Sequence, residues 1–172
     1  LWLQLPEELS APLAPRTEAA RAIDQLLEVG TQLRNPGGCP WDAEQTHHSL
    51  RKYVLEEAHE VVEALDRLPP NAPHPQGPFD QEAYGAVQEE LGDLLYQVVF
   101  HSLLAAEVNA FTFADVVDGI RDKLIRRHES VFGEGDPPSS VAEALAEWER
   151  VKSEEKLAVQ LLAAKVENRN PL

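Results

Sequence analysis

The sequence predicts an all-α protein, folded as an antiparallel bundle of about five helices. Three observations favour this class. The chain has 172 residues and is 43% hydrophobic, which is enough for one globular domain with a sizeable core. Apolar residues recur every three or four positions in long stretches, without the strict alternation typical of a half-buried strand. The connections between these stretches are short, which favours antiparallel neighbours.

The first part of the chain reads as a tail followed by one helix. Residues 1–16 contain three prolines and no periodic apolar pattern, so we expect a loose tail. Thr17 is a suitable N-cap for a helix over residues 18–33. The two prolines and two glycines within residues 34–40 end that helix.

A second helix is expected over residues 45–68, after a short turn. We expect Asp42 and Gln45, three residues apart, to form a capping box for that turn. The predicted apolar face of the helix consists of Leu50, Val54, Leu55, Ala58, Val61, Val62 and Leu65. Five prolines and a glycine make residues 69–79 a surface loop.

Three further helices complete the predicted bundle. The third covers residues 80–108, and the fourth begins at a capping-box sequence at Thr112 and ends near Ser130. The fifth starts at Ser140 and continues to about residue 166.

Residues 17–156 are therefore the predicted helical domain. Residues 1–16 precede it as the tail, and residues 157–172 follow it as a helical extension and tail.

Charge and cysteine content limit the function. The formal net charge of −15 argues against nucleic acid as a partner, because a phosphate backbone attracts basic surfaces. The single cysteine, Cys39, excludes an intrachain disulfide and fits a reducing compartment such as the cytoplasm. No stretch is apolar enough to span a membrane, and the first residues lack the pattern of a signal peptide.

Two acidic segments share one spacing: Glu56-Glu57-Ala58-His59-Glu60 and Glu90-Leu91-Gly92-Asp93. Residues i and i+3 lie on one face of a helix, so Glu57 and Glu60 present two carboxylates together. Glu90 and Asp93 do the same. Two such helices side by side would gather four carboxylates, and a hard divalent cation, Mg²⁺ above all, would relieve their repulsion.

A solvated surface is the competing interpretation of these carboxylates, because acidic residues on helices usually face water. The surrounding sequence argues against it. Residues 94–106 are apolar almost all round, apart from Gln97, His101 and Ser102, which predicts a helix buried on most sides. Carboxylates at the margin of a buried helix need a partner, and few bases lie near them in the sequence.

Five segments in this order resemble MazG-type nucleoside triphosphate pyrophosphohydrolases, over residues 24 to 156. They are Gly38-Cys39-Pro40-Trp41-Asp42, the two acidic segments, Lys123 to His128 with Val131-Phe132-Gly133, and Trp148-Glu149-Arg150-Val151-Lys152. The resemblance implies an α-helical, dimeric, Mg²⁺-dependent enzyme that cleaves a nucleoside triphosphate to the monophosphate and pyrophosphate. Mn²⁺ is the expected substitute ion. The 29 residues between Glu60 and Glu90 exceed the usual gap of the family.

Spacing and resemblance together make Glu57, Glu60, Glu90 and Asp93 the candidate metal ligands. Glu56, four residues before Glu60, is the candidate to hold a second metal ion or to take a proton from the attacking water.

Basic and aromatic residues are the candidates for substrate binding. Lys123 and Arg127 share a face and suit the β and γ phosphates, although bases in a last turn also complement the helix dipole. The resemblance makes Trp148 and Lys152 nucleotide contacts. Without the resemblance, Trp148 would be interpreted as a core residue and Lys152 as a surface charge.

Two other readings compete with this enzyme. Glu56-x-x-His59 and Glu44-x-x-His47 have the spacing of di-iron ligands, but both precede the third helix, where Glu90-x-x-Asp93 stands instead, so we reject a di-iron site. His59 and His101 read more simply as core or bundle-edge histidines. An acidic helical interaction module without catalysis is the second alternative.

Broad apolar faces on helices two and three predict a homodimer.

Overall fold

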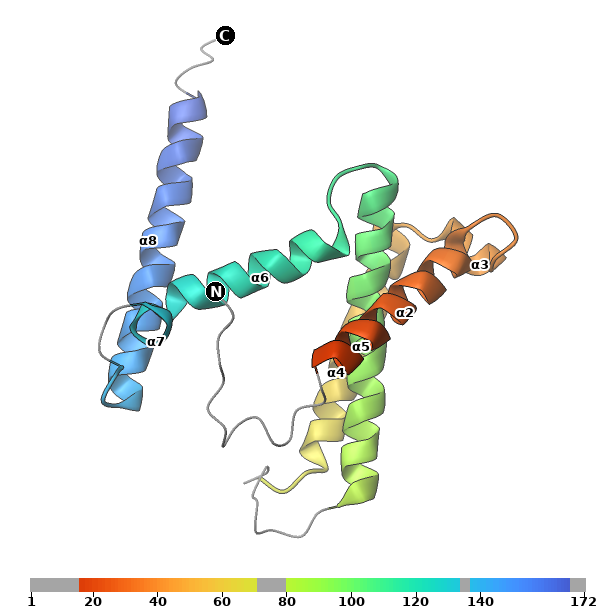
Figure 1. Cartoon of the computed structure of the whole chain (residues 1–172), viewed down its shortest axis with the longest axis horizontal. Helices are drawn as coiled ribbons and strands as arrows, with labels where there is room; N and C mark the ends of the chain where they lie inside the picture. Colours follow the sequence, from red (N-terminus) through yellow and green to blue (C-terminus); the bar gives the residue numbers. More distant parts are fainter. Residues whose placement is uncertain (1–15, 71–79, 134–136, 168–172) are drawn as a thin grey trace. The chain divides into compact units, whose positions relative to one another are not determined.

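The computed structural model describes residues 16–70, 80–133 and 137–167, and all regular structure in these ranges is helical. The all-α class is therefore confirmed. The helices in Figure 1 are α2 (Arg16–Arg34), α3 (Pro40–Glu44), α4 (His47–Asp66), α5 (Gln81–Glu107), α6 (Phe113–Arg127), α7 (Glu129–Phe132) and α8 (Val141–Glu167). The five long helices that the sequence predicts are present, and α3 and α7 are additional short ones. Within the described ranges, no helix has the length and apolar character needed to cross a membrane. Nearly all of the expected tail and loop falls outside these ranges.

The chain divides between Phe113 and Ala114 into two compact units. The first unit contains α2 to α5. The second contains nearly all of α6 together with α7 and α8.

Helices α4 and α5 form an antiparallel hairpin in the first unit (Figure 1). Buried and half-buried residues recur along each helix at alternating spacings of four and three, the pattern of two helices packed side by side. We call these the seam residues. They are Leu50, Val54, Glu57, Val61 and Ala64 on α4, with Leu68 just beyond its end, and Ala83, Val87, Glu90, Leu94, Gln97, His101 and Leu104 on α5. Glutamate therefore occupies one seam position in the middle of each helix.

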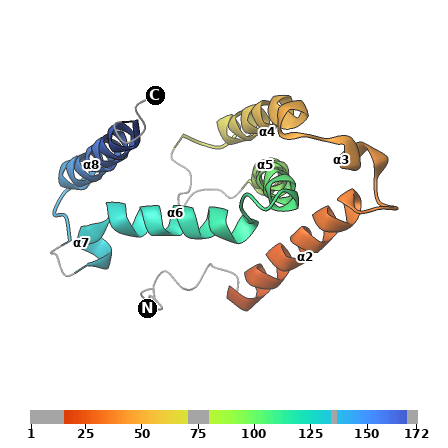
Figure 2. The ribbon, with the colours of Figure 1, turned by 90° about the horizontal axis from the view of Figure 1, so that it is seen from above.

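Helix α5 is the centre of the first unit. Figure 2, which looks nearly along α5, shows α4 and α2 on different sides of it. The hydrophobic core consists of Leu50, Phe100 and Leu104, with Tyr53 and Tyr96 packed against it. Leu50 and Phe100 are each only 1% exposed, so the core holds the α4–α5 hairpin firmly at the end where α4 begins.

Two residues of α2 determine how it meets α5. A Cβ atom on Gly30 would lie 2.7 Å from Leu103 Cδ1, so any larger residue here would require the Leu103 side chain to shift. At the end of α2, Arg34 Nη2 donates a hydrogen bond of 2.9 Å to Glu107 Oε2, and Nη1 donates to the main-chain oxygen of Asp42. The guanidinium lies 5.4 Å from the centroid of the Phe100 ring. One arginine thus ties α2, α3 and α5 together.

The start of the second predicted helix differs from expectation. The expected capping box of Asp42 and Gln45 is wrong, because Pro40 begins α3, which places Asp42 inside a short helix and Gln45 at its C-cap. The capping box lies at Thr46 and Ser49 instead: the Thr46 side chain accepts from Ser49 N, and the Ser49 side chain accepts from Thr46 N. The serine hydroxyl replaces the glutamate or glutamine that the usual pattern requires.

The predicted apolar face of the second helix was too wide. Leu50, Val54 and Val61 are seam residues. Leu55, Val62 and Leu65 remain exposed, and Leu55 is 73% exposed. Each of these three directly follows a seam residue, so they form a second stripe along one flank of α4.

Polar contacts contribute much of the packing in the second unit. Helix α6 has no buried residue, and it ends at Arg127 rather than near Ser130. Ser130, in the short helix α7, donates from its main-chain nitrogen and its hydroxyl to the carboxylate of Glu147 on α8, at 3.0 and 2.6 Å. Among the residues of this unit whose burial is described, Val151 of α8 is the buried apolar one.

Candidate functional site

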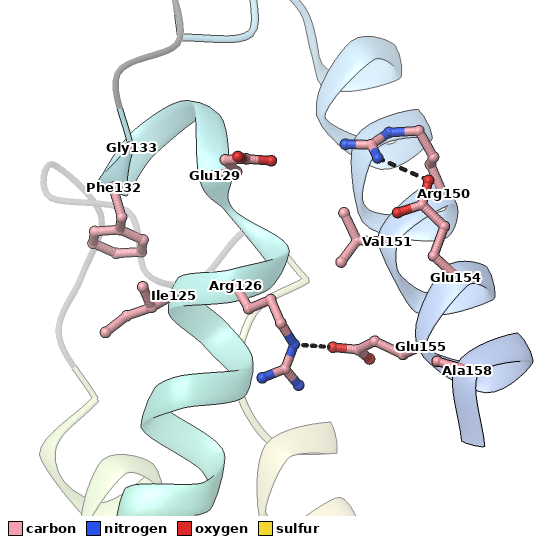
Figure 3. Close-up of a pocket in the computed structure, with 10 residues that line it drawn as sticks. All are labelled: Ile125, Arg126, Glu129, Phe132, Gly133, Arg150, Val151, Glu154, Glu155 and Ala158. Carbon is pink, nitrogen blue, oxygen red and sulfur yellow. Dashed lines mark hydrogen bonds and ion pairs between the residues drawn. The ribbon is translucent and has the colours of Figure 1, made fainter. Parts of the chain in front are cut away.

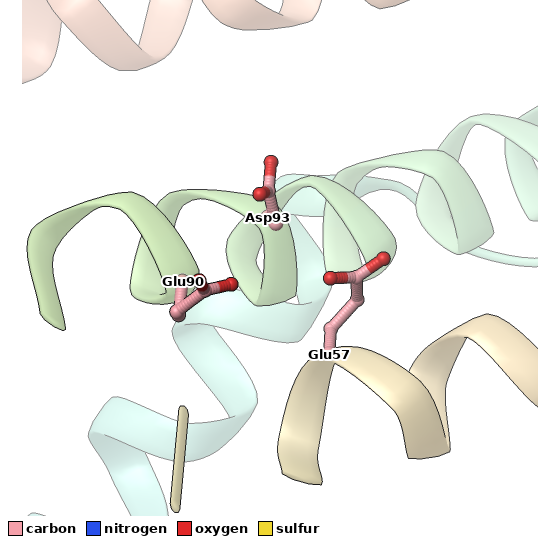
Figure 4. A group of neighbouring side chains, drawn as sticks. All are labelled: Glu57, Glu90 and Asp93. Carbon is pink, nitrogen blue, oxygen red and sulfur yellow. The ribbon is translucent and has the colours of Figure 1, made fainter. Parts of the chain in front are cut away.

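Three carboxylates from α4 and α5 converge in the middle of the hairpin. Glu57 extends from α4 toward Glu90 and Asp93 on α5 (Figure 4). One oxygen of each residue lies within 4.8 Å of one oxygen of the other two. Glu57 and Glu90 are half-buried because they are seam residues, whereas Asp93 is exposed. The predicted convergence of the two acidic segments is therefore present for three of the four expected ligands.

The electrostatics of this cluster are those of a site without enough positive charge. Burial, followed by the charges of Asp93 and Glu60, raises the pKa of Glu57 above its ordinary value. Burial, followed by the charges of Glu60 and Asp93, likewise raises the pKa of Glu90. Both shifts mean that the protein alone disfavours the ionised carboxylates. An all-oxygen set of this kind fits a hard divalent cation such as Mg²⁺.

The other two predicted acidic residues lie at the edge of the cluster. Glu60 is exposed, but its charge acts on both Glu57 and Glu90. Glu56 is also exposed and is not part of the converging group. A residue next to a seam position points about 100° away from the seam, which explains why Glu56 is separated from the cluster.

Two residues near the cluster were not predicted from the sequence. Arg67, the C-cap residue of α4, counteracts the rise in the pKa of Glu90 through its positive charge. Gln97 is a seam residue one turn beyond Asp93, and its Oε1 atom is buried without a hydrogen-bond partner among the described residues. Gln97 could have been found from the sequence, because it follows Asp93 by four residues and such residues lie on one face of a helix. No comparable signal in the sequence pointed to Arg67.

In the second unit, Arg127 is engaged by two neighbouring side chains. Its Nη2 and Nε atoms donate to Glu155 Oε2 at 2.7 and 3.0 Å. Its guanidinium also lies 4.9 Å from the centroid of the Trp148 ring. Arg126 donates to the other oxygen of Glu155. Two predicted substrate contacts, Arg127 and Trp148, thus touch each other, and Glu155 currently satisfies the arginine.

The remaining predicted contacts are exposed. Lys123 lies on α6, and Lys152 on α8 forms an exposed ion pair of 3.1 Å with Glu149. Arg127 and Lys152 line a common hollow of about 370 Å³ with Lys156, a residue that we did not predict. Lys156 follows Lys152 by four residues, so the same helical spacing brings both ammonium groups to one face of α8.

A second hollow of the same unit has a mixed lining. The cavity of about 520 Å³ in Figure 3 lies among α6, α7 and α8. Arg126 and Arg150 face it, but each is paired with a glutamate, Glu155 and Glu154 respectively. Ile125, Phe132 and Val151 supply an apolar wall. Two arginines and three glutamates line this cavity, whereas three bases and one glutamate line the hollow at Lys152, so this cavity is less suited to a polyphosphate.

The histidines of the two Glu-x-x-His sequences do not belong to the carboxylate cluster. His59 Nδ1 lies 3.5 Å from Glu63 Oε1, one turn further along the exposed side of α4. His47 contacts His101 instead. This arrangement agrees with the rejection of a di-iron site.

Comparison with known proteins identifies relatives of this chain. Residues 45–132, more than half of the chain, match the family described as MazG nucleotide pyrophosphohydrolase domain. The chain is 40% identical over 139 residues to "Nucleoside triphosphate pyrophosphohydrolase/pyrophosphatase MazG" of Thermotoga maritima, which covers 81% of this chain and 47% of the relative. It is 42% identical over 135 residues to "Nucleoside triphosphate pyrophosphohydrolase" of Escherichia coli K12, which covers 78% of this chain and 46% of the relative.

A solved structure has the same fold. The "Crystal structure of mazG-related protein from Thermotoga maritima" matches with a TM-score of 0.54 at 23% identity, over 76% of this chain and 98% of that chain. The present chain spans about half the length of the curated relatives just described. Because the family match extends over more than half of its residues, the chain belongs to the MazG nucleotide pyrophosphohydrolase domain family.

Proposed function

We propose that this protein is a Mg²⁺-dependent nucleoside triphosphate pyrophosphohydrolase. It cleaves a ribo- or deoxyribonucleoside triphosphate between the α and β phosphates, and the products are the monophosphate and pyrophosphate. The observation that carries the proposal is the convergence of Glu57, Glu90 and Asp93 on the α4–α5 seam, in a chain of this family. Mn²⁺ is the expected substitute ion, because it also prefers oxygen ligands.

The carboxylates position the metal and thereby the triphosphate. A bound Mg²⁺ supplies neutralisation of phosphate charge and activation of water. Glu57, Glu90 and Asp93 hold the ion, and Glu60 is the proposed fourth ligand because its charge already acts on Glu57 and Glu90. Glu56 is the proposed acceptor of the proton from the attacking water, or a ligand of a second ion.

The bases of the second unit are the proposed contacts for the substrate. Lys123 and Arg127 bind the β and γ phosphates, and Trp148 and Lys152 contact the nucleotide. Arg127 is supported by its place in the hollow with Lys152, where a phosphate would replace Glu155 as the partner of the guanidinium. The net charge of −15 argues against nucleic acid as the partner, and it is compatible with a nucleotide because metal ions and these few bases offset the repulsion. The unpaired thiol of Cys39 supports the reducing cytoplasm as the location.

We also propose a homodimer, formed through one flank of the α4–α5 hairpin. Six large apolar residues directly follow seam residues and remain exposed: Leu55, Val62 and Leu65 on α4, and Leu91, Leu95 and Val98 on α5. Because the helices are antiparallel, residues in this position on both helices face the same side. An apolar surface on a two-helix hairpin is self-complementary, since a second copy related by a two-fold axis buries the same residues.

The dimer is tested by its mass in solution. Sedimentation of the intact chain at micromolar concentration is expected to give twice the mass of one chain. Replacing Leu95 by Lys is expected to shift the mass toward one chain, whereas replacing the exposed Val29 of α2 is expected to leave it unchanged. A mass of one chain before any substitution would disprove the dimer.

The activity is tested by product analysis. The purified chain is incubated with a panel of ribo- and deoxyribonucleoside triphosphates and Mg²⁺, with and without chelator, and the phosphate products are separated. Monophosphate and pyrophosphate, lost on chelation, are the expected result. Diphosphate and inorganic phosphate would place the cleavage elsewhere, and absence of turnover by this folded chain would favour the non-enzymatic interaction module.

Two matched variants connect the activity to the cluster. Glu57→Gln removes one charge at the point of convergence and is expected to abolish turnover while the fold is retained. Glu63→Gln removes one charge from the same helix at an exposed position paired with His59, and is expected to keep full activity. Equal activity of both variants would contradict the assigned metal site.

A further inference from the structure

One lysine of the second unit is not used by the function proposed above. Lys156 lies on α8, and it lines the same hollow of about 370 Å³ as Arg127 and Lys152. It is exposed, and it forms no ion pair with any residue that the structure describes. The other two bases are already paired, Arg127 with Glu155 and Lys152 with Glu149. Lys156 is thus the base of this hollow whose charge is available to an added anion.

The spacing of charges along α8 explains why Lys156 is unpaired. Residues three and four positions apart are neighbours on a helix, and for Lys156 these are Lys152, Ser153, Val159 and Gln160. None of the four is a carboxylate, although glutamates are frequent elsewhere on this helix. One of them is a second lysine, and like charges at a spacing of four repel each other. An anion held between the two ammonium groups would relieve that repulsion.

The charge balance of this hollow also differs from that of two larger hollows among the described residues. Three bases and one carboxylate line it. The cavity among α6, α7 and α8 has two arginines and three glutamates, and a hollow beside Arg67 has one arginine and three acidic residues. In a chain with a net charge of −15, an excess of bases around one hollow indicates a site for an anion.

The carboxylate of Glu155 already occupies part of this anion site. One of its oxygens accepts hydrogen bonds from Arg127, and the other accepts one from Arg126. Hydrogen bonds from these two arginines lower the pKa of Glu155, so the carboxylate is ionised at neutral pH. An incoming phosphate therefore competes with Glu155 for Arg127. Lys156 supplies a positive charge that Glu155 does not use, and this charge favours the phosphate in that competition.

We propose that Lys156 is a further substrate-binding residue, which contacts the terminal phosphate of the nucleoside triphosphate in this hollow. Arg127 is the proposed contact for the β and γ phosphates, so the anion that enters the hollow is the end of the triphosphate. A terminal phosphate carries about two negative charges near neutral pH, more than an inner phosphate does. The contact makes triphosphates better substrates than diphosphates. This inference rests on the proposed function and adds a selection by phosphate number.

Titration calorimetry of the intact chain with inorganic tripolyphosphate, in chelator, tests the contact without requiring turnover. The wild-type chain is expected to bind tripolyphosphate, and Lys156→Gln is expected to weaken that binding roughly three- to fivefold. Lys156→Arg keeps the charge and is expected to restore most of the affinity. The control is Lys52→Gln, which removes an exposed lysine of α4 and is expected to bind as the wild type does.

Steady-state kinetics connect the contact with the choice of substrate. With a nucleoside triphosphate and Mg²⁺, Lys156→Gln is expected to raise KM roughly three- to fivefold and to leave kcat nearly unchanged, because the contact is the same before and during the reaction. With the corresponding diphosphate, the variant is expected to match the wild type, because the phosphate that reaches Lys156 is missing.

Several results would overturn this role of Lys156. One is absence of tripolyphosphate binding by the wild-type chain, and another is equal affinity of the wild type and Lys156→Gln. A loss of the same size in Lys52→Gln, or an equal rise in KM for triphosphate and diphosphate, would show that Lys156 acts only through net charge. Absence of turnover with every nucleotide would instead contradict the proposed function, and the tripolyphosphate titration would still decide whether Lys156 binds phosphate.

Discussion

The first unit brings Glu57, Glu90 and Asp93 together, with the charge of Arg67 acting on Glu90, whereas the second unit surrounds Glu155 with Arg126 and Arg127. The pKa values follow this difference. Burial and like charges raise those of Glu57 and Glu90, while hydrogen bonds from the two arginines lower that of Glu155. Carboxylates that are paired with bases stabilise a fold. Carboxylates without such bases indicate that a ligand supplies the missing positive charge.

The two units also differ in how they are packed. Leu50, Phe100 and Leu104 form a buried core in the first unit, so the repulsion among its carboxylates acts on a framework that is held by apolar contacts. In the second unit, Glu147 and Glu155 connect α7 and α6 to α8 through hydrogen bonds and ion pairs. The carboxylate cluster, whose charges repel one another, thus lies in the unit with the stronger hydrophobic core.

The largest expected contrast comes from removing one carboxylate in each unit. Glu90→Gln is expected to lower turnover by about a hundredfold or more, because the Mg²⁺ that would compensate the substrate charge loses one of its ligands. In the absence of metal, the same variant is expected to melt at a higher temperature than the wild type, since one repelling charge is gone. Glu155→Gln is expected to melt lower, because Arg126 and Arg127 lose their partner. Activity assays measure the loss of turnover, and thermal melts in chelator measure the changes in melting temperature. If both variants changed the melting temperature by the same amount in the same direction, the comparison would be contradicted.

Truncating one buried side chain in each unit tests the difference in packing. Phe100→Ala is expected to lower the free energy of unfolding by about 3–5 kcal/mol, because a large cavity replaces the ring in the core. Val151→Ala is expected to lower it by about 1–2 kcal/mol in the second unit, since only two carbon atoms are lost. Urea unfolding followed by fluorescence, with Trp41 or Trp148 as the single remaining tryptophan, reports on each unit. A larger loss for Val151→Ala would show that the second unit depends on apolar packing.

The two units are expected to respond to pH in opposite directions. Glu57 and Glu90 have raised pKa values, so their contribution to stability is complete below the ordinary carboxyl value of 4.5 and is lost as pH rises through the raised values. Glu147 and Glu155 have lowered pKa values, so their contribution is present above 4.5 and is lost as pH falls through the lowered values. Melting temperatures of the same single-tryptophan chains, measured in chelator at pH values below and above 4.5, report how the stability of each unit changes with pH. Excess Mg²⁺ is expected to abolish the pH dependence of stability in the first unit and to leave that of the second unit unchanged.

Regular spacing made the fold and most of the carboxylate cluster predictable. The long helices followed from apolar periodicity and from the prolines and glycines between them, and the i, i+3 spacing brought Glu90 and Asp93 to one face. The same reasoning could not separate Glu57 from Glu60, which it also expected as a ligand. That distinction depends on the register of α4 against α5, which places Glu57 on the seam and leaves Glu60 exposed beside it.

Contacts between distant segments were not predictable from the sequence. The apolar residues Leu55 and Val61 look alike in the sequence, but only Val61 is covered by α5. Histidines 47 and 101 are 54 positions apart, and only the pairing of the two helices brings their nitrogens together. Glu155 gave no signal as the partner of Arg126 and Arg127, because ion pairs between helices have no fixed sequence spacing.

The smallest expected effect concerns Arg67, the base that acts on the carboxylate cluster. Its positive charge opposes the rise in the pKa of Glu90, so Arg67→Gln is expected to raise that pKa further. The arginine is exposed at the end of α4, and solvent screens its charge, so the shift is expected to be small and to shrink as salt is added. An NMR titration of the Glu90 carboxyl carbon in the metal-free chain measures it, with Arg51→Gln on the same helix as the control. If both variants shift the titration equally, Arg67 acts only through the net charge of the chain. If Arg67→Gln lowers the pKa of Glu90, burial and repulsion from neighbouring carboxylates do not explain the electrostatics of this site.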